Sequence, residues 1–110
     1  MALNRWRGSL VLLLTLAWAS TASAQIRSAT ITGTVAKVHE EDGCELYALH
    51  QADDRLVMVE KWASADALRA HSRGAALAAQ APRLDGKLSG PAEVIVLKAV
   101  PAGDPAKGQL

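Results

Sequence analysis

The stretch LVMVEKWAS, residues 56–64, carries the clearest fold signal in this chain of 110 residues. Leu56–Val59 is an apolar, partly β-branched run, which favours a β-strand that continues through Glu60, Lys61 and Trp62. The preceding run ELYALH, residues 45–50, is a second strand candidate, and the polar link Gln51–Asp54 contains two aspartates, which favour a turn. Two strands joined by so short a link predict an antiparallel hairpin. Both strands are apolar on both faces, so we expect a sheet covered on both sides, as in a barrel or between subunits.

The sequence that follows this hairpin predicts two short helices. Ser64 is a suitable N-cap for the first helix, and Asp66 lies in the first turn, where the helix dipole favours an anion. Gly74 is expected to end or kink that helix. Ala75–Gln80 predicts a second, alanine-rich helix, and we expect Pro82 to stop it soon afterwards.

The remaining sequence comprises the C-terminal part, from residue 83 onwards, and the region before the hairpin, residues 29–42. Residues 83–91 predict a loop, and Ala92–Val100 predicts a last strand around a continuous run of β-branched side chains. The tail from Pro101 to Leu110 contains two prolines and two glycines, so we expect it to be mobile. Ala29–Val38 favours a strand by composition, whereas residues 36–42 could equally close a helix; the pattern leaves both readings open.

Composition sets the class of protein. A chain of this length forms one domain at most, and 50% hydrophobic residues with 21% charged residues indicate a globular fold. The net charge is +1 and there is no long basic run, which argues against nucleic-acid binding. The single cysteine, Cys44, excludes an intramolecular disulfide and a multi-cysteine zinc site. A core this small can bury more apolar surface by oligomerisation, so we expect a homodimer.

The first 24 residues have the pattern of a secretory signal. Arg5 and Arg7 precede the apolar run Leu10–Ala19, and the small residues of Ala22–Ala24 predict cleavage before Gln25. An N-terminal core helix is the structural alternative. The run is too short to cross a membrane as a helix, and no cysteine follows for a lipid anchor, so we expect no stable membrane anchor. With a true signal the protein would be secreted or periplasmic.

Candidates for chemistry are few. His39, His50 and His71 do not show a metal-binding spacing, so we expect no metal site. Cys44 is more typical of a small core residue than of a nucleophile. Glu60 precedes Trp62 by two residues, so both side chains point to one face of the strand. A carboxylate on such a face must be paired or line a cavity, since a buried bare charge is costly.

Three motifs in order closely resemble the antibiotic biosynthesis monooxygenase family, including its quinol monooxygenase members. They are E-x-G-C-x-x-Y at residues 41–47, E-x-W-x-S at residues 60–64 and A-L-x-x-H at residues 67–71, and the resemblance runs from about Glu40 to Leu97. It implies a ferredoxin-like α+β domain over residues 25–100. In the family two such domains pair into a dimeric α/β barrel with antiparallel sheets, and a cytoplasmic location is usual.

The resemblance also implies an activity. Family members insert oxygen into quinols or polycyclic phenols without metal, flavin or other cofactor, because a deprotonated, electron-rich phenol can pass an electron to dioxygen itself. Carried over to this sequence, the catalytic residues are His71 and Trp62, and the substrate-binding residues are Tyr47, Met58 and Glu60. His71 is our choice for proton transfer, because the ordinary histidine pKa of about 6.5 suits neutral pH.

Two departures from the family pattern leave alternatives open. The family normally begins with a strand and a long helix before the E-x-G-C motif, and here the signal-like segment and Gln25–Val38 occupy that region. Either these elements are degenerate or the start of the chain is not the native one. Degenerate elements would favour a non-catalytic dimer that binds a small apolar ligand. Haem-degrading relatives place a histidine at the position of Ala81, so haem degradation is disfavoured.

Overall fold

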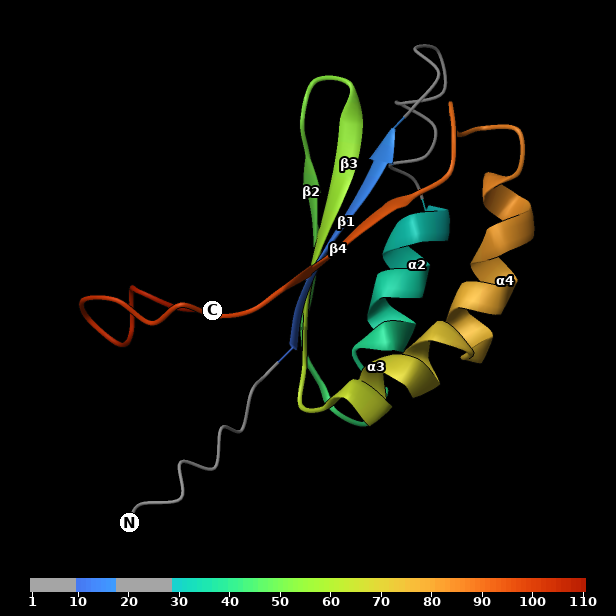
Figure 1. Ribbon diagram of the computed structural model, residues 1–110. Coiled ribbons are helices and arrows are strands. Elements are labelled where there is room, and N and C mark those ends of the chain that lie inside the picture. Colours follow the sequence, from blue (N-terminus) through green and yellow to red (C-terminus); the bar gives the residue numbers. More distant parts are fainter. Residues whose placement is uncertain (1–9, 18–28) are drawn as a thin grey trace.

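The computed structural model describes residues 10–17 and 29–110, which form a four-stranded antiparallel sheet and three helices (Figure 1). The strands lie in the order β2-β3-β1-β4, and β1 pairs with both β3 and β4. This is the ferredoxin-like α+β topology that the sequence predicted. The elements are β1 (Leu10–Ala17), α2 (Ala29–Val38), β2 (Cys44–Gln51), β3 (Arg55–Trp62), α3 (Ala65–Ser72), α4 (Ala75–Leu84) and β4 (Glu93–Leu97).

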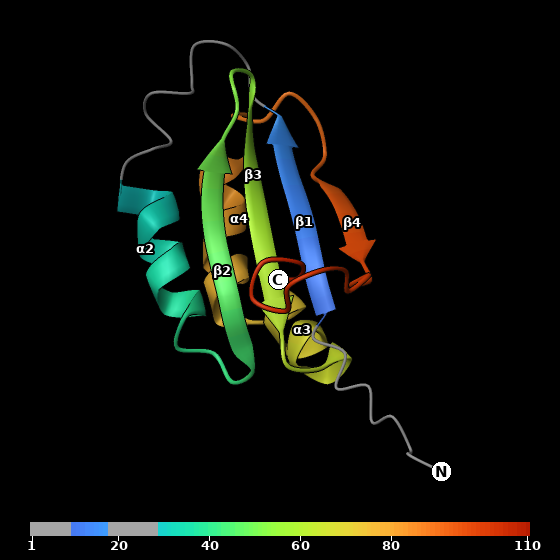
Figure 2. The same ribbon diagram turned by 90° about the vertical axis from the view of Figure 1, so that its left-hand side faces the viewer.

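The helices lie on one face of the sheet and leave the other face uncovered by any helix (Figures 1 and 2). The sheet is open and does not close into a barrel within one chain. An apolar row crosses the uncovered face from strand to strand, through the register pairs Ala48–Val59, Val59–Leu13 and Leu13–Ile95. The apolar side chains of β2 and β3 thus pack against the helices on one face of the sheet and form this row on the other.

Strand β1 is made from the apolar run that we interpreted as the core of a signal sequence. Leu10–Ala17 pairs along its whole length with β3, so the alternative of an N-terminal core helix is wrong. The strand and helix that the family pattern requires before the E-x-G-C motif are therefore both present, as β1 and α2. The predicted cleavage site before Gln25 lies outside the described residues.

Helix α2 resolves the ambiguous region. Its sequence ATITGTVAKV contains β-branched residues and an internal glycine, which are weak helix formers. Packing outweighs this preference, because Ile31, Thr34 and Val38 recur at helical spacing and are all buried. Ile31 packs on Leu56 of β3. The helix is thus selected by the sheet that it covers.

Two predicted boundaries differ from the structure. Pro82 lies inside α4, which continues to Leu84, whereas we expected the proline to stop the helix. Leu84 packs against the cluster of Ile31 and Leu56. This contact favours a helix that continues past Pro82 to Leu84. The last strand is shorter than predicted and spans Glu93–Leu97. Within residues 10–17 and 29–110, no helix is long and apolar enough to cross a membrane.

Candidate functional site

The inner face of the sheet brings three of the predicted site residues together. Tyr47 of β2 lies opposite Glu60 of β3, and a register shift between Cys44 and Leu46 sets Cys44 opposite Trp62 at the end of the hairpin. The burial of β3 alternates, and its buried positions include Met58, Glu60 and Trp62. Glu60 and Trp62 therefore share one face, as their spacing predicted.

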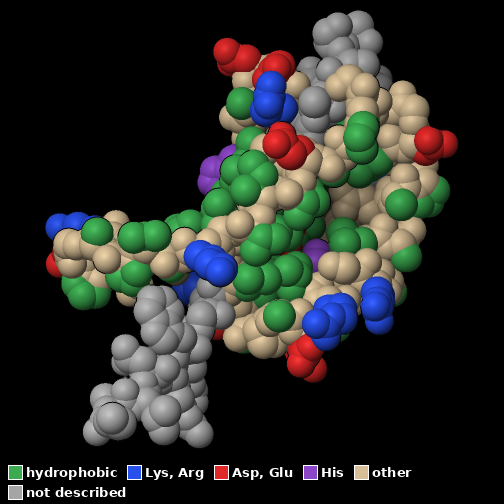
Figure 3. All heavy atoms as spheres, viewed as in Figure 1, with side chains coloured by type: hydrophobic (Ala, Val, Ile, Leu, Met, Phe, Trp, Pro, Cys, Tyr) green, Lys and Arg blue, Asp and Glu red, His purple; other side chains and the backbone are tan. Residues whose placement is uncertain are grey.

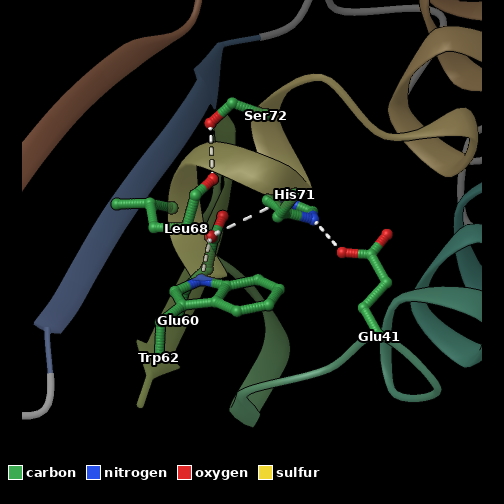
Figure 4. Close-up of polar contacts among 6 residues, drawn as sticks. All are labelled: Glu41, Glu60, Trp62, Leu68, His71 and Ser72. Atoms are coloured by element: carbon green, nitrogen blue, oxygen red, sulfur yellow. Dashed lines mark hydrogen bonds and ion pairs between the residues drawn. The ribbon is translucent and has the colours of Figure 1, made fainter. Parts of the chain in front are cut away.

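Helix α3 adds His71 to this group. The helix begins after Ser64, whose hydroxyl accepts a hydrogen bond from the backbone N–H of Ala67 at 3.1 Å, so the predicted N-cap is confirmed. From this start His71 lies two turns along the helix and points back to the sheet, where its side chain is buried (Figure 4). Its ring stacks on Trp62, with centroids 4.5 Å apart, and meets Tyr47 edge to face at 5.3 Å.

Gly43 permits this close approach of the helix. It has a φ of 80°, and a β-carbon at this position would lie 2.6 Å from the β-carbon of Ala67 in α3. Its carbonyl also accepts a hydrogen bond from the backbone N–H of Ala63 at 2.8 Å. The glycine of the E-x-G-C motif is therefore required where the hairpin meets the start of α3.

Glu60 is a buried carboxylate with two partners. Only 2% of the residue is exposed, and its Oε2 accepts a hydrogen bond from Nε1 of Trp62 at 3.0 Å. Nε2 of His71 lies 3.9 Å from the same oxygen. Burial raises the pKa of Glu60, and the Trp62 hydrogen bond and the nearby imidazole oppose this rise. The pairing that the sequence required for a buried carboxylate is thus supplied by the indole.

His71 lies between two carboxylates. Its Nδ1 donates a hydrogen bond to Oε2 of Glu41 at 2.7 Å, which leaves Nε2 directed towards Glu60 (Figure 4). An imidazole held in this way can accept a proton at Nε2 and be stabilised as a cation by both neighbours. We call Glu41, His71 and Glu60 the acid–base cluster. Sequence reasoning did not select Glu41, although it is the first residue of the E-x-G-C motif.

An apolar pocket of about 130 Å³ lies between the sheet and the helices. Tyr47 and Met58 are among its lining residues, whereas Glu60, Trp62 and His71 are not. Figure 3 shows the hollow between β4 and α4, with hydrophobic side chains gathered on its sheet side. The pocket is lined by Leu14, Tyr47 and Met58 from the sheet and by Ile31, Leu77, Gln80, Ala81 and Leu84 from the helices.

A second, larger cavity of about 550 Å³ lies on the other side of His71. It is charged, since Lys37, Glu40, Glu41 and Asp42 all contribute to its wall beside His71. Tyr47 lines the apolar pocket and His71 lines the charged cavity, and the contact between their rings separates the two. The acid–base cluster therefore borders the charged cavity through Glu41 and His71, and the Tyr47 ring separates it from the apolar pocket.

The other candidates, two histidines and the cysteine, are not part of the acid–base cluster. Nε2 of His39 lies 2.8 Å from the backbone carbonyl of Tyr47, and His50 is exposed at the far end of β2. Cys44 is half-buried, and burial raises the pKa of its thiol, which makes it a weak nucleophile. Over residues 10–17 and 29–110, no three histidine, cysteine or acidic side chains are grouped to hold a metal ion.

Comparisons with a family profile and with solved structures point to the same protein family. The profile of the antibiotic biosynthesis monooxygenase family matches residues 19–82. PA3566 from Pseudomonas aeruginosa is 25% identical with a TM-score of 0.73, over 84% of this chain and 95% of that one. A provisionally assigned antibiotic biosynthesis monooxygenase from Caulobacter crescentus CB15 is 28% identical with a TM-score of 0.67, over 84% and 91%.

A further solved structure, an antibiotic biosynthesis monooxygenase, is 21% identical with a TM-score of 0.75. The similarity covers 84% of this chain and 99% of that one, and at this identity it supports the shared fold. No significant match was found among curated proteins.

Proposed function

This chain belongs to the antibiotic biosynthesis monooxygenase family, and we propose that it is itself a monooxygenase that oxidises a small quinol or a related electron-rich phenol. The proposal includes catalysis without a metal, flavin or other cofactor. In this chemistry the substrate supplies the electrons, and the protein supplies an apolar pocket, a proton acceptor and a donor for the developing oxyanion.

The observation that carries the proposal is the acid–base cluster one ring contact away from the apolar pocket. His71 is 4% exposed, stacks on Trp62 and has a carboxylate on each side. Buried ionisable groups of this kind are costly for stability and concentrate at functional sites. Burial also raises the pKa of Tyr47, so its hydroxyl stays protonated and can donate a hydrogen bond to a phenolate.

The proposed reaction converts a quinol and dioxygen into a hydroxyquinone and water, and a phenol with one hydroxyl group would give a quinone and water in the same way. A base removes the phenolic proton, and the phenolate passes one electron to dioxygen. The resulting radicals combine, so that a new carbon–oxygen bond forms at a ring carbon. Loss of the hydrogen from that carbon and cleavage of the O–O bond then give the second carbonyl and release one oxygen as water. Four electrons pass from the ring to dioxygen, and both protons end on the water.

In this scheme each side chain has a separate task. Tyr47 holds the phenolate oxygen and Met58 contributes to the apolar wall. His71, which meets the Tyr47 ring from the other side, is the final acceptor of the phenolic proton and returns it for the release of water. Trp62 holds the His71 ring and the Glu60 carboxylate in position. Glu41 orients the imidazole through Nδ1 and connects it to the charged cavity.

Oxygen uptake by the purified full chain tests this proposal. We expect uptake with small quinols in the presence of a chelator and without added flavin, with one dioxygen consumed per hydroxyquinone formed and with water, not hydrogen peroxide, as the other product. His71→Ala should abolish most of it, and His50→Ala, on the exposed part of β2, is the matched control. Binding of the same quinols without oxygen uptake would contradict the proposal and favour a non-catalytic, ligand-binding dimer.

We also infer that two copies associate through the uncovered face of the sheet. The apolar row through Ala48, Val59, Leu13 and Ile95 crosses all four strands there, and the segment after β4 projects from the same side (Figure 1). Two such faces packed together would complete the predicted barrel and cover the row. Light scattering should give twice the mass of one chain, and the Val59→Glu variant should have the mass of a single chain. A compact monomer across micromolar concentrations would contradict this inference.

The cellular compartment depends on the fate of strand β1. Cleavage before Gln25 would remove Leu10–Ala17, and β3 and β4 would both lose their pairing partner. This favours retention of the segment in the folded protein and a cytoplasmic location over export. N-terminal sequencing of the protein from its host decides between them, since a mature chain that begins at Gln25 would establish secretion.

A further inference from the structure

The apolar pocket contains two buried polar side chains that have no hydrogen-bond partner in the part of the chain that the structure describes. Gln80 is 8% exposed and Tyr47 is 4% exposed. Within residues 10–17 and 29–110, neither the Gln80 amide nor the Tyr47 hydroxyl makes a hydrogen bond. Buried polar side chains are nearly always paired, because an unpaired group loses its bonds to water without compensation. Two unpaired groups in one pocket indicate that a ligand supplies the missing partners.

The two groups belong to opposite walls. Tyr47 comes from strand β2, whereas Gln80 comes from helix α4, and the rest of the lining is apolar. A ligand between them would place polar atoms at two positions and a hydrophobic body elsewhere. A Tyr hydroxyl and a Gln amide can each donate and accept, so both ends of the ligand can be hydroxyl or carbonyl oxygens.

The volume of the pocket limits the body of the ligand. At about 130 Å³ it is close to the cavity of about 150 Å³ that accommodates benzene in an engineered protein core. One aromatic ring fills this volume, and a second fused ring exceeds it and would project from the mouth of the pocket. Met58 and Leu77 stand on facing walls and bound the space from the sheet and from α4.

We propose that Gln80 is a specificity-determining residue, which together with Tyr47 selects a single aromatic ring carrying two oxygens, a hydroquinone. This rests on the proposed function for the identity of the site and deepens it with the substrate class. The Tyr47 hydroxyl holds the oxygen that is deprotonated, and the Gln80 amide holds the other. A polar site of this kind rejects a ligand that lacks the oxygen, since the amide is then left unpaired.

Calorimetric binding without oxygen tests the proposal independently of turnover. The probes are hydroquinone, 4-methylphenol, in which a methyl group replaces one hydroxyl, and 1,4-dihydroxynaphthalene, which adds a ring. We expect the full-length protein to prefer hydroquinone over 4-methylphenol by about 10- to 100-fold, the effect of one unpaired buried group. We expect 1,4-dihydroxynaphthalene to bind more weakly than hydroquinone.

Gln80→Met keeps the approximate volume of the side chain and removes its polar atoms. It should abolish the preference for hydroquinone and leave the affinity for 4-methylphenol equal or higher. Gln51→Met, the same change at an exposed position at the end of β2 outside the pocket, is the matched control and should keep the preference. An unchanged preference in Gln80→Met, or tighter binding of the two-ring compound, would overturn the proposal.

The result is separable from the proposed activity. If the hydroquinone preference depends on Gln80 but no oxygen is consumed, the two-point recognition stands and the monooxygenase assignment fails. If hydroquinone is oxidised and Gln80→Met shows the same preference as the parent, the assignment stands and the role of Gln80 is refuted.

Discussion

The two cavities beside the contact of Tyr47 with His71 differ in what their polar groups bind. In the charged cavity Glu41 is already paired, since it accepts the hydrogen bond from Nδ1 of His71. In the apolar pocket the Gln80 amide and the Tyr47 hydroxyl have no partner among the described residues. Buried polar groups are usually hydrogen-bonded, so an unpaired group in a pocket differs in kind from a paired one. The charged cavity therefore borders groups that already hold one another in place, and we propose the apolar pocket, whose polar groups still have hydrogen bonds to make, as the binding site.

Trp62 supports both regions, and its truncation should have the largest effect. The side chain is fully buried and joins Glu60 and His71 through its hydrogen bond and its ring. Trp62→Ala should lower the free energy of unfolding by about 3–5 kcal/mol. Urea denaturation measures this loss, and Trp62→Phe, which keeps an aromatic ring, should lose less. An unchanged midpoint in Trp62→Ala would show that the indole does not anchor the hairpin.

His71 distinguishes the acid–base cluster from simple packing. If it transfers the proton, His71→Ala should reduce turnover by about 10²–10⁴-fold. The loss of one hydrogen bond to a carboxylate should reduce stability by about 1.5–3 kcal/mol. Both quantities are measured on the same preparation, with the rate normalised to folded protein. A folded His71→Ala variant with the parent rate would refute the catalytic assignment.

Gly43 tests whether the close approach of α3 is required by the cluster. Gly43→Ala places a β-carbon against Ala67 at a positive φ, so we expect a loss of about 1–3 kcal/mol and lower activity. Gly33→Ala is the matched control, because Gly33 lies within α2 and has no atom within 4 Å of the added β-carbon. That variant should gain up to about 1 kcal/mol from helix propensity. Equal effects of the two substitutions would show that the site tolerates a displaced α3.

Glu60 should give the smallest effect, one that depends on pH. Burial raises its pKa, so the folded state favours the protonated form more than the unfolded state does. The stability that this preference contributes is present below the ordinary glutamate pKa and is lost as pH rises through the raised value. Glu60→Gln keeps an acceptor for Trp62 and does not ionise. Its stability relative to the parent should therefore increase from acidic to neutral pH.

Urea denaturation of the parent and of Glu60→Gln at acidic and neutral pH measures this difference. The ionisable groups near Glu60 are His71 and Glu41, and Glu41 adds to the rise of its pKa, so the double variant Glu60→Gln with His71→Ala controls for the contribution of the imidazole. A stability difference that stays constant with pH would contradict the raised pKa.

Local patterns were sufficient for the hairpin and its corner. The alternation in β3 required Glu60 and Trp62 to share a face, and the Ser64 cap defined the start of α3, because both features depend on neighbours in sequence. The motif positions also brought Tyr47, Trp62 and His71 into one group. The burial of Gln80 in the pocket wall could not be predicted, because an alanine-rich helix gives no sign of which polar residue faces a pocket.

The sequence by itself determined the β2–β3 hairpin, the start of α3 and the family, since these depend on residues close along the chain. The tertiary structure decided the fate of Leu10–Ala17 and of Ala29–Val38, whose sequences suit a signal or a strand. β1 is selected by pairing with β3 and β4 on both of its edges, and α2 by burial of Ile31 and Val38 against the sheet. Such long-range contacts outweigh local propensity because each buries apolar surface that an isolated segment would leave in water.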